Sequence, residues 1–536
     1  MKNNKIKKQE MGNMKNIKVL ITEPFEKEGK EILLKEGFQI DEIGKPSKEE
    51  LLNIISNYDV LIVRSGTKVT KEIIEKGENL KIIGRAGVGL DNIDVEAATE
   101  YGIIVMNAPE GNTISAAEHT IALIFSLARN IPIANQTLKN GKWEKKKFVG
   151  TELYGKTLGI IGLGRIGKRV AHLAKSIGMK VIGYDPYVNE EEIREIGITM
   201  VNFEGVLKQA DILTFHLPLT EETYHMISDK AFEIMKDGVM IVNCARGGII
   251  DEEALVRYLK NGKIKGAALD VFEKEPIEKS PLFEFENVIV TPHLGASTKE
   301  AQINVACQLA TQIVEAVNKK IVKNAINFPS IDEKSQEKLK GYFALGEKMG
   351  NFLRQMEEYF KCIEITYSGE ITNYDLSLLR ANILVGLLKE EKKINVINAL
   401  LIMKEKGIKL IERREKTGGE FTNLITVEIK NSKSVSVSGT LVGNEGRIVK
   451  IDGFSVDAVP EGVLLVCYNE DKPGIMGHIG TILGQNGINI ASMTLGRKEK
   501  GGPAITVLNL DQEVNNEVLY KIKEFPAINS VRLVRI

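Results

Sequence analysis

The stretch Thr157-Leu-Gly-Ile-Ile-Gly-Leu-Gly-Arg-Ile-Gly167 decides the fold of this chain. Residues 157–161 are mostly apolar, as in a buried strand, and a helical pattern over residues 168–176 follows the glycines. Gly162 permits a tight turn, Gly164 lets the backbone approach a pyrophosphate, and Gly167 allows the helix to pack closely on the strand. The stretch therefore predicts a dinucleotide-binding strand–turn–helix unit.

The residues after this glycine turn predict which dinucleotide binds. Arg165 and Ile166 lie in the glycine turn that opens this helix, whose N-terminal N–H groups would face the pyrophosphate. The next strand, 180–184, ends at Asp185-Pro186, and Asp185 lies 18 residues after Gly167. A carboxylate at this point accepts hydrogen bonds from the ribose hydroxyls and repels a 2′-phosphate, so we expect NAD rather than NADP.

Short apolar strands alternate with helical segments on both sides of this unit. Upstream, strands are expected at 18–21, 59–63 and 81–84, which predicts a first parallel sheet covered by helices. With 157–161 and 180–184, four more segments complete a second sheet of six strands: 212–215, 239–242, 267–271 and 288–290. Six strands are the number of a complete dinucleotide-binding sheet.

Composition and charge exclude several functional classes. Lys and Arg together number 72, as do Asp and Glu, so the net charge is zero and indicates no nucleic-acid partner. No apolar run reaches the roughly 18 residues that span a bilayer, so we expect no membrane contact. The four cysteines are widely spaced, which favours a reducing cytoplasm and argues against disulfides or a metal site.

Three polar stretches follow successive strands of the second sheet, at 242–248, 268–276 and 291–296. The carboxyl ends of parallel strands border the ligand crevice, so Arg246, Glu275 and His293 are expected to converge there.

The chemistry of these three residues fits hydride transfer from an alcohol. His293 is a base for the hydroxyl proton, Glu275 would orient its imidazole, and Arg246 offers a planar fork for an α-carboxylate. Asp270 is expected to orient the nicotinamide or to support Arg246. His216, at the end of another strand, competes with His293 for the role of base, and each of these residues taken singly has a structural explanation.

These motifs carry a resemblance. GLGRIG, NCARGGIIDEEAL, ALDVFEKEP and TPHLGAST are similar to those of the D-2-hydroxyacid dehydrogenase family. From about residue 15 onward the chain resembles the long branch of that family, which oxidises 3-phospho-D-glycerate to 3-phosphohydroxypyruvate on the way to L-serine. The resemblance implies Arg246, Glu275 and His293 as catalytic residues. It adds cofactor contacts to the glycine turn and to Asp185-Pro186, namely Val88, Leu217, Pro218, Cys244, Ala245, Arg246, Asp270, His293 and Gly295.

The same resemblance implies a substrate site that reaches into the first unit. Arg64 resembles the family's phosphate- or carboxylate-binding arginine, with Ser65, Gly87, Asn112, Arg246 and His293 as its neighbours. Some relatives carry a second arginine where this chain has Gly66. The alternative for Arg64 is an ordinary surface ion pair.

The C-terminal residues resemble an ACT domain, a small ligand-sensing βαββαβ fold, and residues 330–460 resemble the intervening domain of the long enzymes. Asn395-Val-Ile-Asn-Ala399 is the recognisable part of that intervening stretch. Asp471, Pro473, Gly474 and Asn489 are expected to bind serine as the effector. The alternative is a dimerising domain that senses nothing.

We therefore expect an α/β protein with two Rossmann-like parallel-sheet domains, an α+β intervening domain and a ferredoxin-like ACT domain. The expected division is a flexible lead-in at 1–16, a substrate domain at 17–108 and 299–329, an NAD-binding domain at 109–298, and further domains at 330–460 and 461–536. Pairing through Trp143 and through the ACT domain would give a homodimer or homotetramer. The alternative functions are a glyoxylate or hydroxypyruvate reductase and an NADH-sensing corepressor.

Overall fold

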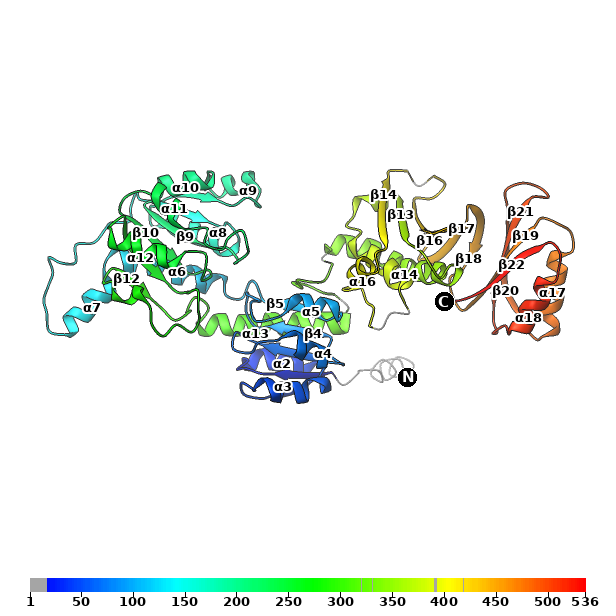
Figure 1. Cartoon of the computed structure of the whole chain (residues 1–536), viewed down its shortest axis with the longest axis horizontal. Helices are drawn as coiled ribbons and strands as arrows, with labels where there is room; N and C mark the ends of the chain where they lie inside the picture. Colours follow the sequence, from blue (N-terminus) through cyan, green and yellow to red (C-terminus); the bar gives the residue numbers. More distant parts are fainter. Residues whose placement is uncertain (1–16, 320, 330, 390–392, 418) are drawn as a thin grey trace, which may run out of the picture.

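The computed structural model describes residues 17–536 except 320, 330, 390–392 and 418, so the expected lead-in at 1–16 lies outside the described residues. Four sheets follow one another in sequence, each with its own helices, and together they form an elongated molecule (Figure 1). Among the described residues, no helix is long and apolar enough to cross a membrane. We call the four parts the first to fourth units.

The first unit is a five-stranded parallel sheet in the order β2-β1-β3-β4-β5. Helix α13 (Lys299–Val314) returns to this sheet from far along the chain and buries Val305, Leu309 and Ile313 in its core (Figure 1). The elements are β1 (Lys18–Ile21), α2 (Lys27–Lys35), β2 (Gln39–Glu42), α3 (Lys48–Ile54), η2 (Ile55–Asn57), β3 (Val60–Val63), α4 (Lys71–Lys76), β4 (Ile82–Arg85), α5 (Val95–Glu100) and β5 (Ile104–Asn107).

The second unit is a seven-stranded parallel sheet in the order β12-β11-β10-β9-β6-β7-β8. All six expected strands are present, and β8 (Thr199–Met200) adds a two-residue edge. The strand order reverses between β6 and β9, so a crevice lies at the carboxyl ends of these strands, beside the glycine turn.

The remaining elements of the second unit are α6 (Thr113–Ala128), α7 (Ile131–Lys139), β6 (Thr157–Ile161), α8 (Arg165–Ser176), β7 (Lys180–Tyr184), α9 (Glu190–Glu195), α10 (Phe203–Gln209), β9 (Ile212–Phe215), α11 (Asp229–Ile234), β10 (Val239–Asn243), α12 (Glu252–Lys260), β11 (Ile264–Leu269), η3 (Pro281–Glu284) and β12 (Val288–Val290).

The third unit is a mixed six-stranded sheet in the order β14-β13-β15-β16-β17-β18, packed against two long helices. Only the β13–β14 pair is parallel. The elements are α14 (Glu333–Met356), β13 (Cys362–Gly369), η5 (Glu370–Asn373), α15 (Ser377–Leu387), α16 (Ala399–Glu405), β14 (Lys409–Glu415), β15 (Asn423–Lys430), β16 (Ser434–Val442), β17 (Glu445–Ile451) and β18 (Phe454–Ala458). The π-helical η4 (Glu315–Lys319), which precedes them, continues α13 and packs on the core of the first unit.

The fourth unit is an antiparallel sheet in the order β20-β21-β19-β22, and its chain order confirms the expected βαββαβ pattern. One sheet face packs on its helices, whereas the other buries Leu464, Val466, Ile505 and Val507 in the core of the third unit. The two units are therefore joined by a continuous apolar core. The elements are β19 (Val463–Glu470), α17 (Ile475–Gln485), β20 (Ile490–Arg497), β21 (Pro503–Leu510), α18 (Asn516–Lys523) and β22 (Ile528–Arg535).

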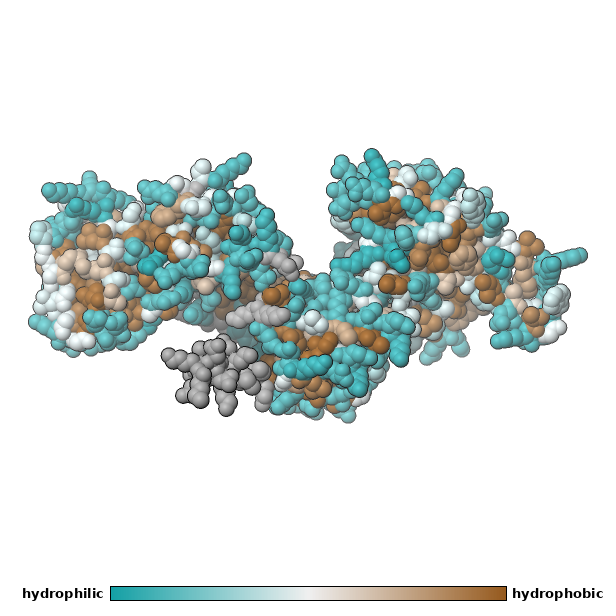
Figure 2. Space-filling model, turned by 180° about the vertical axis from the view of Figure 1, so that it is seen from behind, coloured by the Kyte–Doolittle hydropathy of each residue, from teal (hydrophilic) through white to brown (hydrophobic). Residues whose placement is uncertain are grey.

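The surface is mostly hydrophilic, with small apolar patches between polar side chains (Figure 2). Several large apolar side chains are nevertheless exposed within residues 131–154 of the second unit. Trp143, which is 81% exposed in the single chain, is one of them, with Ile131, Leu138, Val149 and Tyr154.

Candidate active site between the two parallel sheets

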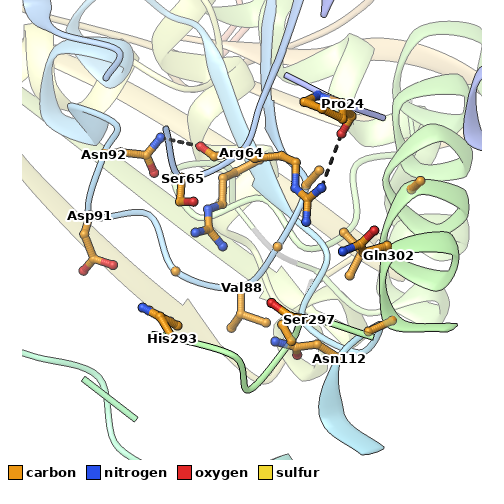
Figure 3. Close-up of a pocket in the computed structure, with 18 of the residues that line it drawn as sticks. Pro24, Arg64, Ser65, Val88, Asp91, Asn92, Asn112, His293, Ser297 and Gln302 are labelled. Carbon is orange, nitrogen blue, oxygen red and sulfur yellow. Dashed lines mark hydrogen bonds between the residues drawn. The ribbon is translucent and has the colours of Figure 1, made fainter. Parts of the chain in front are cut away.

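A cavity of about 520 Å³ lies between the first and second units and collects the expected catalytic residues. Arg246, Glu275 and His293 line it from the second unit. The expected substrate residues reach the same cavity, namely Arg64, Ser65, Gly87, Val88 and Asn112. Figure 3 shows Arg64, Ser65, Val88, Asn112 and His293 around one space, with the helix that carries Gln302 along its side. The fold thus brings together residues more than 200 positions apart.

His293 and Glu275 form the hydrogen-bonded pair at the centre of this site. The Nδ1 atom of His293 lies 2.8 Å from Glu275 Oε2, and the backbone N–H of Phe272 donates to Glu275 Oε1 at 3.1 Å. Burial raises the pKa of Glu275, but the hydrogen bond and the charge of His293 outweigh it, so the net shift is downward. The carboxylate therefore stays ionised near neutral pH, and Nε2 is the ring nitrogen that can exchange a proton with a substrate.

Asp270 holds the turn that carries His293. It is fully buried, and its carboxylate accepts hydrogen bonds from the backbone N–H groups of Leu294 (2.7 Å) and Gly295 (2.9 Å) and from the Thr291 hydroxyl (2.5 Å). Burial raises the pKa of Asp270, but these bonds and His119, 3.1 Å away, lower it overall. Of the two roles expected of Asp270, support of Arg246 is not seen, since no hydrogen bond joins these two described residues, and the Asp270 carboxylate bonds this turn instead.

His216, the competing base, lies elsewhere. Its ring is hydrogen-bonded to the Thr214 hydroxyl at 3.2 Å, and desolvation lowers its pKa to about 3. It is therefore neutral at physiological pH, and it does not line the cavity. The geometry favours His293 because only His293 combines a carboxylate partner with access to this space.

Two glycines make room for two guanidinium groups beside the base. A Cβ at Gly89 would lie 2.2 Å from Arg246 Nη2, and a Cβ at Gly87 would lie 2.1 Å from Arg85 Nη1. Arg246 donates to the Ala245 carbonyl at 2.7 Å and lies 3.4 Å from Asp91. Gly87 and Gly89 thus leave space for the two arginine side chains.

Arg85 is a site residue that the sequence interpretation missed. It lines the cavity, and its Nε is buried without a hydrogen-bond partner. Desolvation lowers its pKa to about 10, and the nearby charge of Arg246 adds to this effect. Asp91 and Glu23 oppose this shift of the pKa, but no hydrogen bond compensates the buried Nε, so this position favours an anionic ligand. The available signal was an arginine at the end of β4, two residues before Gly87.

Glu23 shapes the loop that carries Arg64 and Ser65. Its carboxylate accepts hydrogen bonds from the backbone N–H groups of Arg64 (2.9 Å), Gly66 (3.0 Å) and Thr67 (2.9 Å). From the other side, the Asn92 amide donates to the carbonyls of Arg64 and Thr67, at 2.7 and 2.6 Å. Arg64 itself reaches the Pro24 carbonyl at 3.5 Å (Figure 3). Neither Glu23 nor Asn92 stood out in the sequence as a determinant of this loop.

The glycine turn has the geometry that a dinucleotide requires. Gly162 has φ +95°, and a Cβ at Gly167 would lie 2.1 Å from the Gly162 carbonyl oxygen. A Cβ at Gly164 would meet nothing within 4 Å, so this position is open to a ligand at the start of α8. Asp185 accepts the Leu163 N–H at 2.9 Å, directly beside the turn. These residues fit NAD, with the pyrophosphate over Gly164 and the ribose near Asp185.

The other expected cofactor residues lie at neighbouring strand ends of the same edge. Pro186 follows β7, Leu217 and Pro218 follow β9, and Cys244 and Ala245 follow β10. Burial raises the pKa of the Cys244 thiol to about 12, so it remains protonated.

The expected effector residues do not meet within one chain. Asp471 accepts hydrogen bonds from Arg497 (2.6 Å) and from the Gly501 N–H (3.0 Å), next to Pro473 and Gly474. Asn489 donates to Asp511 at 2.6 Å. Arg497 and Asn489 lie at opposite ends of β20. The loop with Asp471, Pro473 and Gly474 is therefore separated from Asn489 by the length of that strand.

Comparison with known proteins matches three parts of the chain to family models. Residues 121–295 match the NAD-binding domain of D-isomer specific 2-hydroxyacid dehydrogenases, residues 338–452 the D-3-phosphoglycerate dehydrogenase intervening domain, and residues 463–527 the ACT domain. A D-3-phosphoglycerate dehydrogenase of Methanocaldococcus jannaschii is 46% identical over 97% of this chain and 100% of its own length. The chain belongs to the D-3-phosphoglycerate dehydrogenase family.

A further relative and a solved structure support the same family and fold. The D-3-phosphoglycerate dehydrogenase of Bacillus subtilis is 43% identical over 96% of this chain and 99% of its own length. Among solved structures, the NAD⁺-bound 3-phosphoglycerate dehydrogenase of Entamoeba histolytica is 35% identical, with a TM-score of 0.51 over 58% of this chain and 99% of its own. The expected family, fold class, enzyme class and NAD cofactor are thereby confirmed.

Gly164→Ala tests the cofactor site separately from the fold. Since a Cβ at this position meets no protein atom, the variant should melt within about 1 °C of the parent protein. We expect its NADH dissociation constant to rise about tenfold or more, because the methyl group would lie where the pyrophosphate approaches. Fluorescence titration with NADH measures this. Unchanged NADH affinity would contradict the placement of the pyrophosphate.

Proposed function

We propose that the protein oxidises 3-phospho-D-glycerate to 3-phosphohydroxypyruvate with NAD, as the first step of the phosphorylated route to L-serine. The observation that carries this proposal is the cavity in which the His293–Glu275 pair faces Arg64, Arg85 and Arg246. A substrate with a carboxylate, a neighbouring hydroxyl and a phosphate matches this combination of one base and several cations.

The two ends of the substrate would bind different units. Arg246, beside His293, is assigned to the carboxylate and the C2 oxygen because its guanidinium can bind two oxygens in one plane. Arg64, Arg85 and Lys68 line the part of the cavity that belongs to the first unit, and we assign them to the phosphate. The backbone of Ser65 and Gly87 and the amide of Asn112 would complete the binding surface.

In the oxidation, His293 Nε2 takes the proton of the C2 hydroxyl as the C2 hydride leaves. Glu275 holds the ring through Nδ1 and stabilises the imidazolium that forms. Arg246 stabilises the negative charge on the C2 oxygen during the transfer. Bound NAD supplies the hydride acceptor. We assign its pyrophosphate to Gly162–Gly167, its ribose to Asp185 and Pro186, and its nicotinamide end to Val88, Ala245 and Gly295.

Beyond the reaction, we propose serine as an effector of the ACT domain. The support is the domain match and the loop at Asp471–Gly474, which precedes the N-terminus of α17. Because Asn489 lies at the other end of β20, a site that uses all four expected residues needs two copies of the domain. We also propose a homodimer formed through the exposed apolar residues 131–154, extended to a tetramer by the ACT domains. The cysteine usage supports the cytoplasm as the compartment.

The tests below distinguish the proposed function from two alternative functions. A glyoxylate reductase of Paecilomyes thermophila is 31% identical, with a TM-score of 0.55, but covers only 58% of this chain. The D-3-phosphoglycerate dehydrogenases of Methanocaldococcus jannaschii and Bacillus subtilis instead match 97% and 96% of it, including the two C-terminal domains. An NADH-sensing corepressor would need neither the substrate arginines nor the His293–Glu275 pair.

A substrate panel with and without serine tests the proposed function. Purified protein should oxidise NADH with 3-phosphohydroxypyruvate at a kcat/KM at least about tenfold above that with glyoxylate, because only the former supplies the phosphate for Arg64 and Arg85. Serine should lower the rate at sub-millimolar concentration. A preference for glyoxylate would contradict the substrate assignment, and an unchanged rate would contradict the serine assignment.

His293→Asn tests the base. Asparagine cannot accept the hydroxyl proton, so we expect kcat to fall by about 10²–10⁴ while the NADH dissociation constant changes less than about threefold. Steady-state kinetics and NADH titration measure the two quantities. The control is His172→Asn, on the exposed face of α8. Loss of NADH binding in the His293 variant would indicate a structural role instead.

Arg85→Met tests the anion site that the structure adds. The variant removes the positive charge that would pair with the substrate phosphate. It should therefore lower kcat/KM for 3-phosphohydroxypyruvate about 10- to 100-fold, and for glyoxylate less than about threefold. The matched control is Arg257→Met, which removes a surface ion pair with Asp229. Equal losses for both substrates would show that Arg85 does not bind the phosphate.

A further inference from the structure

Two asparagines of the intervening domain, Asn395 and Asn398, donate hydrogen bonds to one turn of the first unit, as does Asn327 from the segment that follows α13. Asn395 donates to the Gly102 carbonyl at 2.7 Å, Asn398 to the Glu100 carbonyl at 3.2 Å, and Asn327 to the Ile103 carbonyl at 2.8 Å. This turn, residues 100–103, joins the end of α5 to the start of β5. The carbonyls at a helix end lack partners inside the helix, so they are natural acceptors for these amides.

The fit at this contact is close. A Cβ at Gly102, which has φ +68°, would lie 2.3 Å from the Asn395 amide nitrogen, and the Lys393 ammonium lies 5.7 Å from the centre of the Tyr101 ring. Asn398 is only 1% exposed. We call Asn327, Asn395, Asn398 and the turn 100–103 the asparagine joint.

Hydrogen bonds within residues 395–398 orient the Asn395 and Asn398 side chains toward this contact. Asn395 Oδ1 accepts the Ile397 N–H at 2.9 Å, and Asn398 Oδ1 accepts the Asn395 N–H at 2.8 Å. Asn395 thus uses its oxygen within the intervening domain and its nitrogen across the boundary, whereas the Asn398 amide nitrogen donates both to the Glu100 carbonyl and, at 3.0 Å, to the Lys393 carbonyl of its own loop. This arrangement needs an amide, since a carboxylate of the same size has no proton to donate.

Both elements that leave the turn lead to the substrate pocket. Helix α5 has six residues, so it spans about 9 Å, and its N-cap Asp94 follows the pocket residues Asp91 and Asn92. Strand β5 ends at Asn107, whose amide donates to the Val88 carbonyl at 2.5 Å. The pocket loop, residues 87–92, is therefore held by two elements that meet at the asparagine joint, α5, which ends there, and β5, which starts there.

We propose that the asparagine joint sets the position of the pocket loop and so couples the state of the regulatory half to substrate binding. The inference deepens the proposed function, on which it rests, because the pocket loop lines the proposed substrate site. Asn395 and Asn398 are positioning residues that act through α5 and β5. A shift of the intervening domain would pull on carbonyls 100–103 and change where Val88, Asp91 and Asn92 lie.

Asn395→Asp in the full chain tests the proposal. The carboxylate keeps the acceptor for the Ile397 N–H but places an oxygen against the Gly102 carbonyl, so only the cross-domain bond is lost. The control is Asn382→Asp, whose amide bonds the Leu378 carbonyl within α15 of the same domain. Hydrogen exchange of residues 86–92 and the kinetics with 3-phosphohydroxypyruvate are measured, with and without serine.

We expect hydrogen exchange at residues 86–92 to quicken about threefold or more, and KM to rise about fivefold with kcat within about twofold, in the Asn395 variant alone. Exchange that changes only at residues 100–103 and 393–398, with KM unchanged, would overturn the proposal. If the parent protein does not turn over 3-phosphohydroxypyruvate, the proposed function fails, whereas exchange still decides whether the joint controls the pocket loop.

Discussion

Helix α13 creates the active site because it belongs to both parallel-sheet units at once. Its N-cap Thr298 directly follows the turn of His293 and is hydrogen-bonded to Ser115 of α6 at 2.7 Å. Its apolar face is buried in the core of the first sheet through residues such as Leu309 and Ile313. The distance between the base in one unit and Arg64 in the other therefore depends on the packing of this helix. Its exposed side, with Gln302, forms a wall of the cavity.

Inside that cavity the electrostatics are arranged for a ligand rather than for the empty protein. Arg85 is buried beside Arg246, and the two guanidinium groups raise each other's energy. A fold selected only for stability would replace such a pair with apolar side chains. Gly87 and Gly89 have no side chain, which leaves room for both guanidinium groups. On the opposite wall, Asp270 and Glu275 keep their charge through hydrogen bonds to the His293 turn and its ring. Binding of an anion between the two guanidinium groups would relieve this repulsion.

The intervening and ACT domains are connected to this site through a shared apolar core and through hydrogen bonds to the first unit. The ACT sheet and the intervening domain share one apolar core, so displacement of one carries the other. The intervening domain in turn meets the first unit through oriented amide groups rather than through a large apolar contact. Hydrogen bonds of this kind constrain direction yet are individually weak, and a contact of that type can shift without unfolding either domain. If the ACT domain binds serine as proposed, this boundary is where its state would be passed to the first unit.

Local patterns in the sequence determined the elements of this protein. Apolar runs beside glycines predicted six of the seven strands in the nucleotide sheet, while β8 was missed because two residues are too short to show a period. The glycine turn, the acid after β7 and the motifs with Arg246, Glu275 and His293 were equally readable, because each is a short segment with its own geometry. The βαββαβ order of the ACT domain was predicted for the same reason.

Contacts between distant segments were decided only by the tertiary structure. It showed that Asp270 holds the His293 turn, that Arg85 is buried in the cavity, and that Asn489 lies a strand away from Asp471. It also showed that Asn395 and Asn398 contact the end of α5. Hydrophobic periodicity and turn residues can be recognised in the sequence because each depends on only a few neighbouring residues. The burial of a charge and the partner of an amide depend on which surfaces pack together, and that is settled only when the whole chain is folded.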